Sequence, residues 1–180
     1  SGRLAAVSAA PGVIELFDLE HRAVVRSVVT PGDVTLLDID DAGAIAASGL
    51  DWAHAWAPGA RQPTVAYAVP ADAVVQQVFV ADDGRSIIVI NRGGSVILAR
   101  EPAGAATELL QQLAGPATYH AGTRRLAMAT ARNIVLVTLD RERVPRSLIR
   151  APGEKAASVV QFDRSGRLAV VSVALYVESG

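Results

Sequence analysis

The sequence contains no cysteine, and this absence removes several classes of site. Disulfide bonds, thiolate metal centres and cysteine nucleophiles all require that residue. Long apolar runs are also absent, because the longest one, from Leu168 to Val177, is interrupted by Ser172 and is about half the length of a membrane-spanning helix. We therefore predict that the chain does not insert into a membrane.

The sequence also has almost no excess of charge of either sign. The chain has 17 Lys and Arg against 18 Asp and Glu, and its formal net charge is −1. Such a balance creates no general attraction to nucleic acid or to an anionic membrane, so we expect neither as a partner. Lys155 is the only lysine, a usage common in high-GC bacteria, and no charged n-region precedes an apolar segment. These two features predict a bacterial protein of the cytoplasm.

The aliphatic content, by contrast, is high. Apolar residues make up 51% of the 180 residues but aromatic residues only 4%, so the core must consist of Ala, Val, Leu and Ile. A chain of this length can bury a sizeable core. Intrinsic disorder is therefore not expected.

A repeat runs through the whole sequence. Small turns followed by an apolar stretch have their glycines at positions 2, 43, 84, 122 and 166, so the period is about 41 residues. Each period holds one strand-like segment before the turn and three after it. The segments before the turns are 34–38, 74–80 and 159–163; the third strands are 13–18, 95–99 and 134–138; the fourth strands are 23–29, 64–69, 107–113 and 144–149.

These segments are rich in β-branched residues and are bounded by Gly, Pro, Asp and Asn, which is the pattern of short strands and turns. Segment 107–113 also fits a helix, because Leu109, Leu110 and Leu113 have helical spacing, and helical repeats of similar length form solenoids. The other segments leave no room for two helices in a period. We predict an all-β protein, a β-propeller with four-stranded antiparallel blades.

Several turns and strands resemble those of the WD-repeat family of propellers. Segments 82–85 and 163–167 are similar to the family's turn between the first two strands, and segment 13–19 resembles its third strand, with Phe17 in place of the Trp of the Trp-Asp pair. The family's Gly-His pair is absent, so we expect the buried polar network that it supports to be missing. The resemblance implies a divergent WD-like propeller that serves as a protein-interaction scaffold.

The period also divides the chain into blades. We expect a partial blade at 1–30, whole blades at 31–70, 71–114 and 115–151, and a partial blade at 152–180. This is about 4.4 repeats, whereas propellers have about four to eight complete blades. We interpret the chain as a segment of a longer propeller, whose missing blades come from the rest of the polypeptide or from another chain.

Motifs for catalysis are absent from the sequence. It has no G-x-S-x-G, no phosphate-binding loop and no G-x-G-x-x-G. We expect His21 to lie in a surface turn, His54 to pack between blades beside Trp52 and Trp56, and His120 to lie near the propeller axis without a metal. Acidic residues recur in the turns, and we interpret them as turn-closing rather than calcium-binding: Asp38, Asp40, Asp41, Asp82, Asp83 and Asp163. No catalytic residue, metal or cofactor is predicted.

Candidate binding residues lie in the loops that join a blade to the next and its second strand to its third, which gather at one end of a propeller. The charged residues of these loops are Asp33, Asp51, Asp72, Arg92, Arg132 and Lys155. Acidic members fall on the earlier blades and basic members on the later ones, a split that would orient a dipolar partner. Simple solvation of these charges is the alternative.

The sequence thus favours a non-catalytic interaction scaffold with a protein partner. A second hypothesis is a propeller that binds a small ligand, or carries out lyase or hydrolase chemistry, at its central channel. A third is a sensor region attached to a signalling domain.

Overall fold

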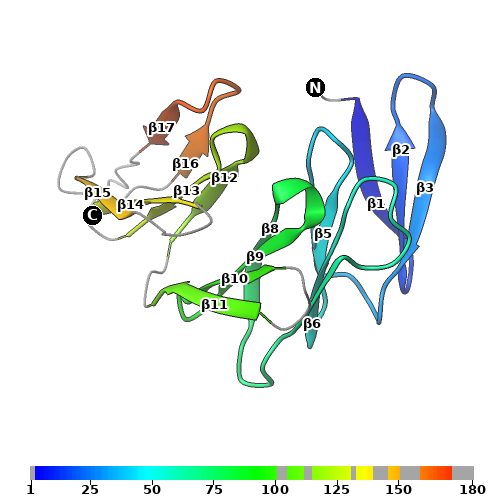
Figure 1. Ribbon diagram of the computed structural model, residues 1–180, viewed down its shortest axis with the longest axis horizontal. Helices are drawn as coiled ribbons and strands as arrows, with labels where there is room; N and C mark the ends of the chain where they lie inside the picture. The colour runs from blue at the N-terminus through cyan, green and yellow to red at the C-terminus, as the bar shows by residue number, and fades with distance from the viewer. Residues whose placement is uncertain are drawn as a thin grey trace, which may run out of the picture. The chain divides into compact units, whose positions relative to one another are not determined.

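The computed structural model describes residues 3–100, 105–111, 115–130, 133–139, 146–150 and 159–171. Within these ranges the regular structure is β-sheet, apart from two single turns of 3-10 helix, η1 (Asp82–Gly84) and η2 (Ala121–Thr123) (Figure 1). No helix in these ranges has the length and apolar character required to cross a membrane. The chain divides into two compact units, residues 1–111 and 112–180.

The first unit contains three antiparallel sheets. In each one, every strand pairs with its neighbour in sequence. The first sheet has β1 (Leu4–Ala10), β2 (Val13–Asp18) and β3 (Ala23–Val29); the second has β4 (Leu36–Ile39), β5 (Ile45–Ser48), β6 (Trp52–Trp56) and β7 (Val65–Ala68); the third has β8 (Val75–Ala81), β9 (Ser86–Asn91), β10 (Val96–Arg100) and β11 (Ala105–Leu110).

The second unit repeats this plan. One sheet contains β12 (Ala117–His120), β13 (Arg125–Ala129), β14 (Asn133–Thr138) and β15 (Arg146–Arg150), and β16 (Val159–Phe162) pairs with β17 (Leu168–Val171). The predicted all-β class with four-stranded antiparallel blades is confirmed. Segment 107–113, for which helical spacing was an alternative, contributes most of its residues to β11.

Packing between the sheets of the first unit follows from the alternation of side chains along β5 and β6. Ile45, Trp52 and Trp56 point toward the first sheet and pack with Ile14 and Val28. The intervening residues point the other way, and four of them are alanines: Ala44, Ala46, Ala53 and Ala55. These alanines pack against larger residues of the third sheet: Val78, Val80, Ile87 and Val89. The two middle strands of the second sheet, β5 and β6, are therefore buried on both faces, with Ile45 and the tryptophans on one face and four alanines on the other.

Two polar side chains connect neighbouring sheets. The guanidinium of Arg26, on β3, donates to the carbonyl oxygens of Ala57 (2.9 Å) and Gly43 (2.6 Å) in the second sheet's turns. Asp38, on β4, accepts a hydrogen bond from the backbone N–H of Val80 on β8 at 2.8 Å. The turn-closing role predicted for Asp38 is thus wrong, because its side chain points across to the next sheet. Asp40 does close its turn, through the N–H groups of Ala42 and Ala44.

In the second unit, the sheets meet through Ala127, Ala129, Ile134 and Val160. His120 lies at the end of β12, where its Nδ1 accepts from the backbone N–H of Thr123 (3.1 Å) and its ring lies 5.8 Å from that of Phe162. These contacts give His120 a structural role in joining the turn to the next sheet.

Candidate functional site

An open groove of about 720 Å³ lies between the second and third sheets. Three outer strands contribute side chains to it: Tyr67 from β7, Ile97 from β10, and Ala106 and Glu108 from β11. Two loops supply the rest: Pro70, Asp72, Ala73 and Val74 from the connection between the sheets, and Asn91, Arg92, Gly93 and Ser95 from the turn between β9 and β10. The groove therefore joins both kinds of loop in which binding residues were predicted.

The alternation of side chains along the strands determines which residues form the floor of the groove. Tyr67 is two residues after Val65, which is 1% exposed, so both side chains face the third sheet and the phenol ring emerges where the core ends. Ile97 and Ala73 also pack against this core while staying partly exposed. Glu108 pairs with Ile97 across the sheet, which puts its side chain on the same face. The floor is thus an aromatic and aliphatic surface with one carboxylate at its outer side.

The rim of the groove is held by backbone hydrogen bonds. The N–H of Arg92 donates to the carbonyl oxygen of Val74 at 2.7 Å, which ties the β9–β10 turn to the loop between sheets. In the loop between the sheets, the Ala73 N–H donates to the carbonyl oxygen of Pro70. In the β9–β10 turn, the Gly94 N–H donates to the carbonyl oxygen of Asn91. Asp72 and Arg92 are consequently held on neighbouring segments, and both side chains are exposed.

The described lining of the groove carries more negatively charged side chains than positively charged ones. The Glu108 carboxylate accepts from Gln111 Nε2 at 2.7 Å and from the Ser95 hydroxyl, and these bonds hold the pKa of Glu108 below its usual value. Burial and the nearby Glu108 charge raise the pKa of Tyr67. Asn91 adds a buried Oδ1 that has no hydrogen-bond partner in the described part of the chain. Among the described residues that line the groove, Arg92 is the only basic one.

The structure brings together only some of the predicted binding residues. Asp72 and Arg92 line the groove. Asp33 and Asp51 are exposed on the preceding pair of loops, where a Cβ at Gly49 would lie 2.7 Å from the Asp33 carbonyl oxygen. Arg132 and Lys155 lie outside the described residues. Sequence reasoning missed Tyr67, Ile97 and Glu108, because it sought binding residues in loops and these three lie on strands.

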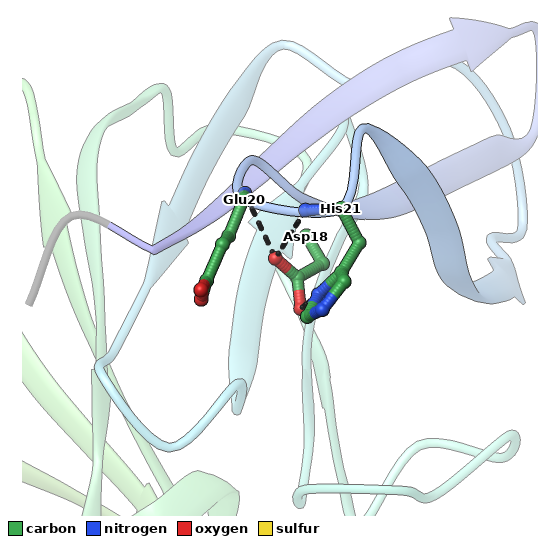
Figure 2. Close-up of side chains that lie close together, drawn as sticks. All are labelled: Asp18, Glu20 and His21. Carbon is green, nitrogen blue, oxygen red and sulfur yellow. Dashed lines mark hydrogen bonds and ion pairs between the residues drawn. The ribbon is translucent and has the colours of Figure 1, made fainter.

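A second cluster, Asp18, Glu20 and His21, has ligand types that could suit a metal ion (Figure 2). Asp18 Oδ1 accepts from the N–H groups of Glu20 (2.9 Å) and His21 (3.2 Å), which closes the turn after β2. Asp18 Oδ2 lies 3.0 Å from Arg3 Nη2 and 2.9 Å from His21 Nδ1. A metal would have to displace these donors, and the arginine already supplies a cation. We assign this cluster to the turn, with His21 64% exposed as predicted.

The tryptophan pair of β6 is structural. His54 lies between the two indoles, with ring centroids 5.3 Å from Trp52 and 5.7 Å from Trp56. Both tryptophans belong to the core between the first and second sheets, so the predicted packing between blades is confirmed. Burial lowers the pKa of His54, which favours the neutral ring in this position.

Comparison with known proteins identifies the fold but no sequence family. No family model matches the chain, and no curated protein matches its sequence. Among solved structures, it is similar to the crystal structure of the Cps50 (Swd1) β-propeller domain of Myceliophteria thermophila. The TM-score is 0.65 and the identity 14%, over 95% of this chain and 59% of that one. The chain therefore has a β-propeller fold and spans a little over half of the domain that it matches.

Proposed function

We propose that this chain is a non-catalytic protein-interaction module, built on a WD-like propeller, that binds an extended peptide segment in the groove between its second and third sheets. The groove itself carries this proposal. It combines a partly buried floor of Tyr67 and Ile97 with exposed charges at the rim, Asp72 and Arg92, that form no ion pair within the described residues. An apolar centre with an aromatic anchor and a polar rim is the usual anatomy of a protein interface.

The shape of the groove also supports a peptide. It is open to solvent, and its volume of about 720 Å³ accommodates a few consecutive side chains. Among the described residues the lining contains no histidine, the most frequent general base, and its carboxylates Asp72 and Glu108 lie on an open surface. Ligand binding or lyase and hydrolase chemistry at the central channel stays a prediction of the sequence, as does a role as a sensor region.

We further propose that additional blades complete the ring. The outer face of the first sheet supports this, because Val7, Val24 and Val29 are 47%, 46% and 74% exposed there. An apolar sheet face of this kind is normally covered. Such blades would come from the rest of the polypeptide or from another chain. A bacterial and cytoplasmic origin is proposed from composition alone.

Selection of peptides that bind the full chain, from a randomised twelve-residue display library, tests the proposed function. We expect selected clones to lose binding to the Tyr67→Ser variant, because that change removes the aromatic floor. Leu50→Ser is the matched control, since Leu50 is 87% exposed on a neighbouring loop and outside the groove. Clones that bind the wild type and Tyr67→Ser equally would contradict the proposal, and so would a selection that yields no clones.

A further inference from the structure

Acidic and basic groups are unevenly distributed along the groove, and this bears on what its partner must carry. Glu108 lies at the outer side of the floor, on β11, close enough to Tyr67 for its charge to affect the phenol. Arg92 lies in the turn that forms the rim. The floor therefore presents a carboxylate next to an aromatic ring, with the cation of the lining kept to the rim.

The Glu108 carboxylate is oriented rather than free to rotate. Gln111 Nε2 donates to its Oε2 at 2.7 Å, and Ser95, which also lines the groove, is a second hydrogen-bonding neighbour. Neither neighbour carries a charge, and no ion pair to Glu108 occurs within the described residues. An oriented carboxylate with neutral neighbours keeps its full attraction for an incoming cation.

A second carboxylate, that of Asp72, adds to the negative potential of the groove. Asp72 is exposed on the loop that closes the groove, and it has no ion-pair partner in the described chain. Asn91 also lines the groove, but its unpartnered amide oxygen is buried and out of reach of a ligand. Among the described residues, the lining therefore has two carboxylates, Glu108 and Asp72, and one guanidinium, Arg92.

We infer that the groove selects a partner segment with a lysine or arginine side chain, whose aliphatic stem lies on Tyr67 and Ile97 and whose charged end binds Glu108. This inference rests on the proposed function and adds the chemistry of the partner. The stem of a basic side chain covers apolar surface while its charged end stays at a polar group, which matches the order of apolar floor and carboxylate here. Contact of the cation with the face of the Tyr67 ring would further strengthen binding of the basic side chain.

The same display library distinguishes this inference from the proposed function. We expect clones that depend on Tyr67 to be enriched in Lys or Arg at one position and depleted in Asp and Glu. Selection on the Glu108→Gln variant should still give Tyr67-dependent clones, without that enrichment. Glu20→Gln is the matched control, because it removes the same charge from an exposed carboxylate in the turn after β2.

A synthetic peptide with the sequence of the strongest clone measures how much the basic side chain contributes to affinity. Replacing its basic residue by norleucine, a neutral residue of similar shape, should weaken binding to the wild type about tenfold and leave binding to Glu108→Gln unchanged. Binding of the basic peptide should also weaken as salt is raised. Tyr67-dependent clones without basic enrichment, or equal affinity of the lysine and norleucine peptides, would overturn the inference and leave the proposed function standing. An absence of Tyr67-dependent clones would overturn both.

Discussion

Gly84 shows how closely two sheets approach at a single residue. Its φ is +79°, and an added Cβ would overlap the backbone of Trp56 and Ala57 in the second sheet. The residue thus combines a left-handed conformation with a contact that leaves no space for a side chain.

We expect Gly84→Ala to destabilise the protein by about 1–3 kcal/mol, and by more if the sheets must separate. Chemical denaturation measures this. Two controls separate the causes: Gly59 has φ +76° with no atom within 4 Å of an added Cβ, and Gly93 has open space without positive φ. Gly59→Ala should show the backbone strain alone and Gly93→Ala neither effect. An equal loss in Gly84→Ala and Gly59→Ala would contradict a steric contact between the sheets.

Asp38 gives the stability a dependence on pH. Burial raises the pKa of Asp38 to about 6, although the Val80 N–H bonded to its carboxylate opposes the change. A carboxyl with a raised folded pKa binds a proton more tightly in the folded state. Its favourable contribution is therefore complete below an unfolded pKa of 3.8 and is lost as pH rises through about 6.

We expect Asp38→Asn to be more stable than the wild type at pH 7, by on the order of 1 kcal/mol, since an amide oxygen accepts the same hydrogen bond without a charge. This advantage should shrink between pH 6 and pH 4 and vanish below. Melting temperatures across this range test it, with Asp33→Asn on an exposed carboxylate as the control. A constant difference at all pH values would show that Asp38 ionisation is not responsible.

At this scale the sequence identified Asp72 and Arg92 by their position in loops, because Gly and Pro mark loops locally. It did not identify Tyr67 or Glu108, since their role depends on which face of an outer strand meets the neighbouring sheet. That face is set by the register of pairing, including the irregularity between Val96 and Ile97 that places Glu108 opposite Ile97. Register of this kind is decided by contacts between strands rather than by the residues of one strand.

Among the strands, β6 best shows how side-chain packing contributes to the free energy of unfolding. Trp56 is completely buried and belongs to the core between the first and second sheets. Alternation puts it beside His54 and Trp52 on a single face of the strand. Removal of its side chain therefore leaves a cavity between two sheets.

We expect Trp56→Ala to cost about 3–5 kcal/mol in the free energy of unfolding, with a smaller loss for Trp56→Phe because much of the volume is kept. The indole N–H has no hydrogen-bond partner within the described structure, so its loss in Trp56→Phe should not add a polar penalty. Leu50→Ala, at an 87% exposed position, is the control and should change little. If both Trp56 variants were equally unstable, cavity volume would not be the cause.

Strand boundaries were predictable where turn chemistry is distinct. The segments 13–18 and 23–29 match β2 and β3, because Pro11 and Gly12 precede the first and Asp18 closes the turn between them. The start of β11 was placed two residues late, at 107 rather than at Ala105. Small residues run through that region of the sequence, so no local signal marks where pairing begins.

At the scale of the whole molecule, the outer face of the first sheet is the surface through which we expect association with another chain. Pairing places Ala5 opposite Phe17 and Phe17 opposite Val24, so these residues share the face that points away from Ile14 and Val28. Val7 lies on the same face, in a shallow hollow lined by Phe17 and Leu19. This surface is exposed and largely apolar, and Glu15 and Ser27 are its polar members, because Glu15 pairs with both Val7 and Ser27.

We expect the chain to self-associate with rising concentration through this face, and Val7→Asp to reduce the association because a charge there would be desolvated. Sedimentation velocity at several concentrations measures the effect. Leu50→Asp is the control, as Leu50 is an isolated exposed residue on a loop. A chain that stays monomeric at high concentration would show that this face does not need a partner.

The two faces of the second sheet carry a consequence for how such a protein can evolve. On its middle strands, the face with the two tryptophans packs on Ile14 and Val28 of the first sheet, and the face with the alanines packs on larger valines and isoleucines of the third sheet. A duplicated copy of this blade inserted beside the original would set indoles against alanines at a spacing made for neither. Despite a common repeat length, the blades are therefore not interchangeable parts, and growth or shortening of the ring requires matched substitutions on both sides of the new junction.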